Sequence, residues 1–199
     1  AAYGAEALVI ECMALQPELQ SLSELRLVRS THGVITNARP DHLDVMGPTA
    51  EHVAQALAGS VPHRGKLFTA ERDHLAILTA AAADRGTEVV VVTEADVTAV
   101  TREELAGFTY TEHPDNVALA LAVTGSLGVP RAVALRGMHR ARPDPGALTE
   151  HDLDFFGRRI RFFNGFAAND PVSTLKLWEH ALRRTPDVER RIAIFNCRA

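Results

Sequence analysis

The strongest constraint on the fold is the alternation of short apolar runs with longer helix-forming segments. Four apolar runs have the length and the flanking turn residues of buried strands, and they occupy 7–10, 33–37, 66–69 and 88–93. Helix-forming stretches follow, the clearest at 71–85 and 116–127. Strands that alternate with helices favour an α/β fold, with a mostly parallel sheet and flanking helices.

The chain is expected to form two regions, 1–148 and 149–199, joined by the proline-containing segment 141–148. The second region is predicted to hold strands at 159–164 and 191–195, with a helix between them. An apolar run begins almost at the first residue, which predicts a piece of a longer protein.

Composition excludes several classes of protein. A hydrophobic content of 46% argues against disorder over the whole length, and a net charge of −4 argues against a nucleic-acid-binding surface. No apolar run approaches the roughly 18 residues of a membrane span. Two cysteines far apart in the sequence are typical of a reduced, cytoplasmic protein.

Polar side chains follow the first two apolar runs, where ligands bind in parallel sheets. Glu11 comes directly after 7–10, and Asp41, His42 and Asp44 follow the second run. A carboxylate and an imidazole can hold a divalent cation, and Mg²⁺ takes only one or two protein ligands beside its waters. The alternative is that Glu11 forms an ordinary ion pair and His42 braces a loop.

Other motifs are absent or ambiguous. The sequence contains no GxGxxG or GxxxxGK[ST] phosphate-binding motif and no nucleophile elbow, so it assigns no catalytic and no substrate-contacting residue. Basic residues cluster at 131–142 and 158–161. These clusters are either solvated faces or sites for phosphate and carboxylate groups.

Two segments carry a resemblance to a known family. ITNARPDHLDVMGPT (35–49) and VIECMALQPEL (9–19) resemble the signature segments of the Mur-ligase and folylpolyglutamate-synthetase superfamily. NGFAANDPVSTLKLWE and the terminal FNCRA are most similar to the synthetase subunits of poly-γ-glutamate capsule synthesis. The resemblance implies part of a central ATP-binding ligase domain over 1–148 and the start of a C-terminal Rossmann-like domain over 149–199.

The resemblance also implies a reaction. Such ligases use ATP and Mg²⁺ to convert a carboxylate into an acyl phosphate, which an amine then attacks. The implied product is glutamate polymerised through γ-carboxyl amide bonds. The implied partners are glutamate or poly-γ-glutamate, membrane-associated synthase subunits at the inner face of the cell membrane, and either further copies of the chain or a complementing N-terminal chain. Nucleic acid is not among them.

Site residues follow from the resemblance position by position. It implies Glu11 and His42 as magnesium ligands. It implies three nucleotide-binding residues: Asn116 at the adenine, Arg140 (with Arg142 as the alternative register) at the nucleotide, and Asp170 at the ribose or phosphates.

The sequence departs from the family in three places, one of which is a lysine of the C-terminal domain motif that has no clear match near Val172. The family's lysine, fifteen residues after the histidine, is replaced by Leu57, which leaves a second metal without its usual ligand. The phosphate-binding loop precedes the matching segment in the family, so the isolated chain is expected to be inactive. Two alternatives stay open: a non-catalytic binding or assembly module, and a related Mur or folylpolyglutamate-type ligase with another acceptor.

Overall fold

The computed structural model describes residues 4–168 and 171–195. The chain divides into two compact units, here called unit 1 (1–142) and unit 2 (143–199). The boundary lies inside the proline-containing segment 141–148. The assignment of these units to parts of two ligase domains stays a prediction.

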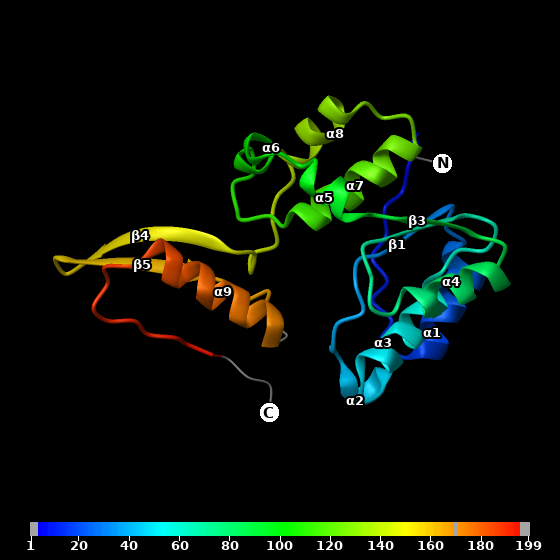
Figure 1. Cartoon of the computed structure of the whole chain (residues 1–199), viewed down its shortest axis with the longest axis horizontal. Helices are drawn as coiled ribbons and strands as arrows, with labels where there is room; N and C mark the ends of the chain where they lie inside the picture. Colours follow the sequence, from blue (N-terminus) through cyan, green and yellow to red (C-terminus); the bar gives the residue numbers. More distant parts are fainter. Residues whose placement is uncertain (1–3, 169–170, 196–199) are drawn as a thin grey trace. The chain divides into compact units, whose positions relative to one another are not determined.

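Unit 1 is built on a parallel sheet of β1 (His32–Ile35), β2 (Lys66–Thr69) and β3 (Glu88–Val91). The strand order is β1-β2-β3, and both pairings are parallel. β1 and β3 are labelled in Figure 1. The α/β fold with parallel pairing predicted from the alternating pattern is confirmed. All three strands lie within the apolar runs that indicated them, or within one residue of them.

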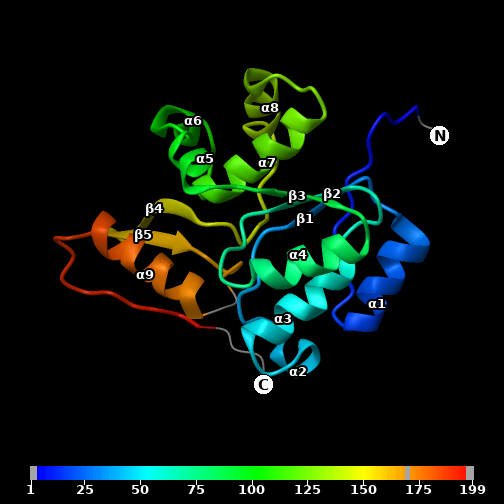
Figure 2. The same cartoon turned by 45° about the vertical axis from the view of Figure 1, so that its right-hand side comes forward.

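Helices cover both faces of this sheet. Successive side chains of β2 point to opposite sides, so each face presents an apolar side chain for helices to cover. Leu67 packs on one face with Val61 and Leu78, under α3 (Ala50–Leu57) and α4 (Leu75–Asp84). On the other face, Phe68 packs against α7 (Pro114–Ser126) and α8 (Arg131–Met138). Figure 2 shows these two helix pairs on opposite sides of the strands. Unit 1 is therefore a three-layer α/β/α sandwich with a core on each face of the sheet.

Local signals in the sequence set several helix ends. Thr49 caps α3, and its side chain accepts a hydrogen bond from the backbone N–H of His52. Gly86 follows α4 with a φ of +63°, the left-handed conformation that ends helices and favours glycine. Thr93 and Thr101 form capping boxes with Asp96 and Glu104, and so begin two short helices that sequence analysis missed.

The remaining elements of unit 1 are short. The helix α1 runs on directly into the π-helical turn η1. The elements are α1 (Pro17–Leu22), η1 (Ser23–Val28), α2 (Leu43–Met46), the 3₁₀ turn η2 (Ala58–Ser60), α5 (Glu94–Thr98) and α6 (Arg102–Ala106).

The prediction of a buried strand at 7–10 is wrong. In the described part of the chain this segment pairs with no strand, and Leu8, Val9 and Ile10 are 79%, 95% and 54% exposed. An apolar run becomes a strand only where a neighbouring strand offers its backbone groups, and β1 pairs only with β2 among the described strands. Glu11 therefore does not stand at the end of a strand.

Unit 2 consists of an antiparallel hairpin and one helix. β4 (Thr149–Phe155) and β5 (Arg158–Asn164) are joined through Phe156 and Gly157, both with positive φ, as a tight hairpin turn requires. The helix α9 (Pro171–Arg184) contacts the hairpin where His180 Nε2 lies 2.9 Å from Glu150 Oε1. β5 and α9 were predicted, whereas β4 was missed because its acidic residues lack the composition of a buried strand.

The prediction of a final strand at 191–195 is also wrong. That segment is neither helix nor strand, and Ile192, Ile194 and Phe195 are 75%, 77% and 69% exposed. As at 7–10, the apolar run has no strand beside it within the described residues. Apolar composition alone does not create a strand without a partner.

Candidate functional site

The carboxyl ends of β1, β2 and β3 meet at one edge of the sheet, called here the carboxyl edge. Ligands bind at this edge in open parallel sheets, because the loops that leave the strands there are free to carry polar groups. The segments that follow the three strands are 36–42, 70–74 and 92–94. The site predicted from the sequence is therefore sought among these loops and at the helix ends that adjoin them.

A buried carboxylate ties two of these loops together. Glu71 Oε2 accepts a hydrogen bond of 2.6 Å from the backbone N–H of Ala38, and Oε1 accepts one of 2.9 Å from the N–H of His74. Glu71 is only 6% exposed. Burial acts to raise the pKa of Glu71, but the hydrogen bonds from His74 and Ala38 outweigh it and lower the pKa below its usual value.

Glu71 thus holds the start of the loop that leads from β1 to His42. The neighbouring Thr69 adds a second link, since its hydroxyl donates a 2.6 Å hydrogen bond to the carbonyl of Ile35 at the end of β1. Because its oxygens are engaged by backbone groups, the Glu71 carboxylate serves to shape the edge. Sequence analysis missed it, although an acid two residues after a buried strand was a signal.

His42 lies at the end of this loop, immediately before α2. Its backbone is left-handed with a φ of 49°, a conformation that is uncommon outside glycine and that requires support from its surroundings. Asp41 supplies part of that support, since its Oδ1 accepts the His42 N–H at 2.9 Å and lies 3.7 Å from His42 Nε2. The side chain of His42 is 27% exposed, so solutes can reach the imidazole.

The structure does not bring Glu11 into contact with His42. Glu11 is exposed in a segment without regular structure, and the described contacts include no hydrogen bond or ion pair between the two residues. Over the described ranges 4–168 and 171–195, no group of three or more His, Cys, Asp or Glu side chains is arranged to hold a metal ion. A magnesium site with one or two protein ligands needs no such group, so the metal assignment stays a prediction.

Two of the residues implied for nucleotide binding lie at the ends of helices in unit 1. Asn116 is exposed in the first turn of α7. Its neighbour Asp115 lies 3.5 Å from Arg72, and Arg72 also lies 3.1 Å from Glu94, so ion pairs tie this turn to the carboxyl edge. Arg140 is exposed just after α8.

For the other positions that the resemblance implied, the part of the chain that the structure describes shows no binding site. Arg142, the alternative to Arg140, is exposed at the last position of unit 1. Asp170 lies outside the described residues. Leu57 packs against the apolar residues under the sheet, which accounts for an apolar side chain where the family has lysine.

Glu112 is a polar centre that sequence analysis did not single out. Its carboxylate accepts hydrogen bonds from Tyr110 Oη at 3.0 Å, from the backbone N–H of His113 at 2.8 Å and from Asn116 Nδ2 at 2.9 Å. Burial and the hydrogen bond to Glu112 raise the pKa of Tyr110 to about 12. The spacing of Glu112 and Asn116, four residues apart across a helix start, was the available signal.

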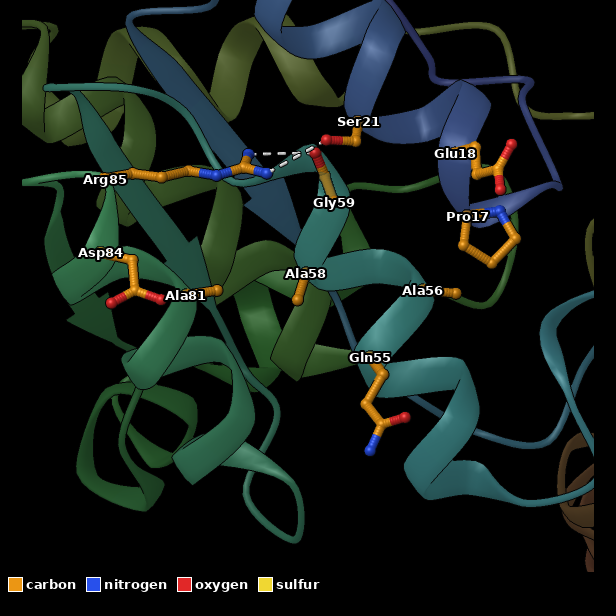
Figure 3. A pocket seen from close by; sticks show the side chains of 10 residues that line it. All are labelled: Pro17, Glu18, Ser21, Gln55, Ala56, Ala58, Gly59, Ala81, Asp84 and Arg85. Atoms are coloured by element: carbon orange, nitrogen blue, oxygen red, sulfur yellow. Dashed lines mark hydrogen bonds between the residues drawn. The ribbon is translucent and has the colours of Figure 1, made fainter.

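A pocket of about 430 Å³ lies elsewhere in unit 1 and contains none of the implied site residues (Figure 3). It is bordered by α1, α3, η2 and the end of α4. The guanidinium of Arg85 spans this region, donating to the carbonyls of Gly59 and Val61 and lying 3.4 Å from Ser21 Oγ. Because Arg85 follows α4 and precedes β3, this region adjoins the amino ends of the strands.

Comparison with known proteins identifies relatives over almost the whole chain. Capsule biosynthesis protein CapB of Bacillus anthracis is 42% identical over 194 residues, which are 98% of this chain and 41% of that protein. PGA synthase CapB of Bacillus subtilis (strain 168) is 39% identical over 196 residues, 98% of this chain and 49% of that protein. The chain therefore spans less than half the length of these curated relatives.

A family model and solved structures agree with these relatives. Residues 150–199 match the family of the poly-gamma-glutamate synthase CapB C-terminal domain. Escherichia coli FolC in complex with DHPP and ADP matches 82% of this chain and 40% of its own, with a TM-score of 0.57 and 20% identity. A point mutant of Lactobacillus casei FPGS matches 83% and 45%, with a TM-score of 0.59 and 13% identity.

The CapB matches confirm the similarity to the synthetase subunits of poly-γ-glutamate capsule synthesis that NGFAANDPVSTLKLWE and FNCRA indicated. The structural neighbours are too different in sequence to inform on anything but the fold, and they confirm an α/β fold of the folylpolyglutamate-synthetase type. In the part of the chain that the structure describes, no helix has both the length and the apolar composition needed to cross a membrane.

Proposed function

We propose that this chain, whose sequence is related to the CapB proteins over nearly its whole length, is the metal- and adenosine-holding part of an ATP-dependent amide ligase that makes poly-γ-glutamate. The observation that carries the proposal is the 42% identity to a capsule biosynthesis protein over 98% of the chain. The carboxyl edge supports it, because this edge presents His42 on an anchored loop and Asn116 beside the Arg72 ion pairs.

Each group at this edge has a definite part in the proposed reaction. ATP would supply the phosphoryl group that activates a glutamate γ-carboxylate, and Mg²⁺ would neutralise the phosphates. His42 would ligate the metal, with Glu71 keeping its loop in place. The exposed amide of Asn116 would contact adenine, and Arg140 would contact the nucleotide.

The arrangement of donors fits this role only in part. The imidazole of His42 is accessible and already lies near the carboxylate of Asp41. Glu11, the other implied ligand, lies on an exposed segment that joins no described strand. We expect Glu11 to act as a ligand only when 7–10 is held as a strand, so metal binding by the isolated chain should be weak.

A chimera provides the direct test. Residues 4–199 replace the matching segment of PGA synthase CapB of Bacillus subtilis, and ATP-dependent formation of γ-glutamyl amide is measured with the partner subunits of that system present. We expect the chimera to make polymer and His42→Ala to abolish it. His63→Ala, at an exposed histidine outside the carboxyl edge, is the matched control and should leave activity unchanged.

Two outcomes would contradict the proposal. One is a folded chimera that hydrolyses no ATP in the presence of glutamate. The other is an unchanged rate in the His42→Ala chimera, which would remove the metal assignment. The isolated chain is expected to show no ATP-dependent amide synthesis, and robust glutamate-dependent ATP turnover by it would overturn that expectation.

A second candidate function is that of an assembly module, which the exposed apolar side chains at 8–10 favour. In that case the segment would pair with another chain, either a second copy or a membrane-associated synthase subunit at the inner face of the cell membrane. Sedimentation of the purified chain, combined with a nucleotide titration, tests this candidate. A clean monomer that binds no nucleotide would argue against the assembly module.

A further inference from the structure

A hydrogen bond accepted by Glu112 determines how the side chain of Asn116 is oriented. Glu112 lies between α6 and α7 and is half-buried, while Asn116 is exposed. Oε1 of Glu112 lies 2.9 Å from Asn116 Nδ2 and 2.8 Å from the backbone nitrogen of His113. Oε2 lies 3.0 Å from the hydroxyl of Tyr110. The carboxylate is therefore held on both oxygens.

This geometry leaves one choice for the Asn116 amide. An ionised carboxylate only accepts hydrogen bonds, so the amide atom that faces Glu112 must be the nitrogen. Turning the amide over would set its carbonyl oxygen against the carboxylate. The Oδ1 oxygen of Asn116, an acceptor, and its second N–H, a donor, are then both available to a ligand.

An acceptor beside a donor distinguishes one purine from another. Adenine presents its N6 amino group as a donor next to the N7 acceptor, and an asparagine amide matches this pair with two hydrogen bonds. Guanine and hypoxanthine carry an acceptor, O6, where adenine carries the amino group. An amide held in the orientation seen here would place Oδ1 against O6.

We propose that Glu112 selects adenine over 6-oxopurines by holding the amide of Asn116 in this orientation. The inference rests on the proposed function, in which Asn116 contacts adenine. Glu112 is a positioning residue in this account, since it acts through Asn116 and not on the nucleotide.

A purely structural role for Glu112 predicts something different. Its bond to the His113 N–H helps to begin α7, so removing it would weaken the fold whatever nucleotide is bound. Glu112→Ala separates the two roles through the AMP-to-IMP ratio, because a weaker fold lowers both affinities alike. Glutamine would not serve, since Oε1 accepts from both His113 and Asn116 and a glutamine oxygen placed there would keep both contacts. Alanine removes the acceptor, so the Asn116 amide is free to turn over.

The experiment titrates AMP and IMP into the ¹⁵N-labelled chain at millimolar concentration and follows side-chain amide resonances by NMR. IMP differs from AMP at the position that Asn116 would read. We expect AMP to bind the wild type about tenfold more tightly, the lower part of the range for a bidentate amide–base contact because the site is exposed. In Glu112→Ala the ratio should fall below about twofold, with the dispersed amide spectrum of a folded chain retained.

Tyr110→Phe is the matched control, because it removes a different hydrogen bond to Glu112 and leaves the Asn116 contact in place. Its AMP-to-IMP ratio should equal that of the wild type. Equal binding of AMP and IMP by the wild type, or an unchanged ratio in Glu112→Ala, would overturn the role of Glu112 while leaving the proposed function standing. Absence of any nucleotide binding by the folded wild type would overturn the adenine contact of the proposed function, and the role of Glu112 with it.

Discussion

Replacement of Glu71 by alanine is expected to cost unit 1 a large part of its stability. The carboxylate accepts charge-assisted hydrogen bonds from two backbone N–H groups, at 2.6 and 2.9 Å, and its side chain is 7% exposed. Hydrogen bonds to a buried charged group contribute about 1.5–3 kcal/mol each. Allowing for partial entry of water, we expect the free energy of unfolding to fall by about 3–5 kcal/mol, against a total of about 5–15 kcal/mol for a typical domain.

The effect should depend on pH with a definite sign. The pKa of Glu71 in the folded chain is lowered from the ordinary value of 4.5. Its ionisation therefore stabilises the fold above about pH 4.5, and this contribution is lost as the pH falls through the folded pKa. The difference between wild type and Glu71→Ala should be largest at neutral pH and should shrink in acid.

Urea unfolding followed by far-ultraviolet circular dichroism at pH 7 and pH 3 measures the difference. Hydrogen exchange of the Ala38 amide reports on the loop itself, because that N–H loses its acceptor. Glu88→Ala is the matched control: its carboxylate is 60% exposed in a pair with Lys66 and should change stability by less than about 1 kcal/mol. A loss below about 1 kcal/mol for Glu71→Ala at pH 7, or an unchanged Ala38 exchange rate, would refute the reasoning.

Three further predictions concern other parts of the chain. Hydrogen bonds from Arg131 hold the pKa of Glu104 at about 2, so Arg131→Ala should raise that pKa toward 4.5 in an NMR titration. Phe68→Ala should lower the free energy of unfolding by about 3–5 kcal/mol in denaturant titrations, because Phe68 is 1% exposed in the core. Gly157→Ala should destabilise the hairpin of unit 2 by about 1 kcal/mol in thermal melts, because its φ is +74°. Gly125→Ala, in α7 with open space around it, is the control for that variant and should be neutral or stabilising in the same measurement.

Regular structure in unit 1 was predictable because its signals are local. The apolar runs of β1, β2 and β3, the cap at Thr49 and the glycine after α4 each act within a few residues of chain. The same holds for the family resemblance, which rests on contiguous segments such as 35–49. Where a run of apolar residues needed a partner from elsewhere, as at 7–10 and 191–195, the sequence predicted strands that the structure does not contain.

The candidate site likewise has a part that local sequence signals indicated and a part that they did not. The sequence indicated His42 and Asn116 through their motifs, and the structure leaves both assignments as predictions while showing what supports each residue. Those supports are contacts that periodicity cannot reveal: Glu71 reaches Ala38 across 33 positions of chain, and Arg72 reaches Asp115 across 43. The sequence by itself determined which segments become strands or helices once a neighbour is present. Only the tertiary structure decided which carboxylates hold the loops, because these hydrogen-bond partners lie far apart in the sequence and are chosen by distance in space.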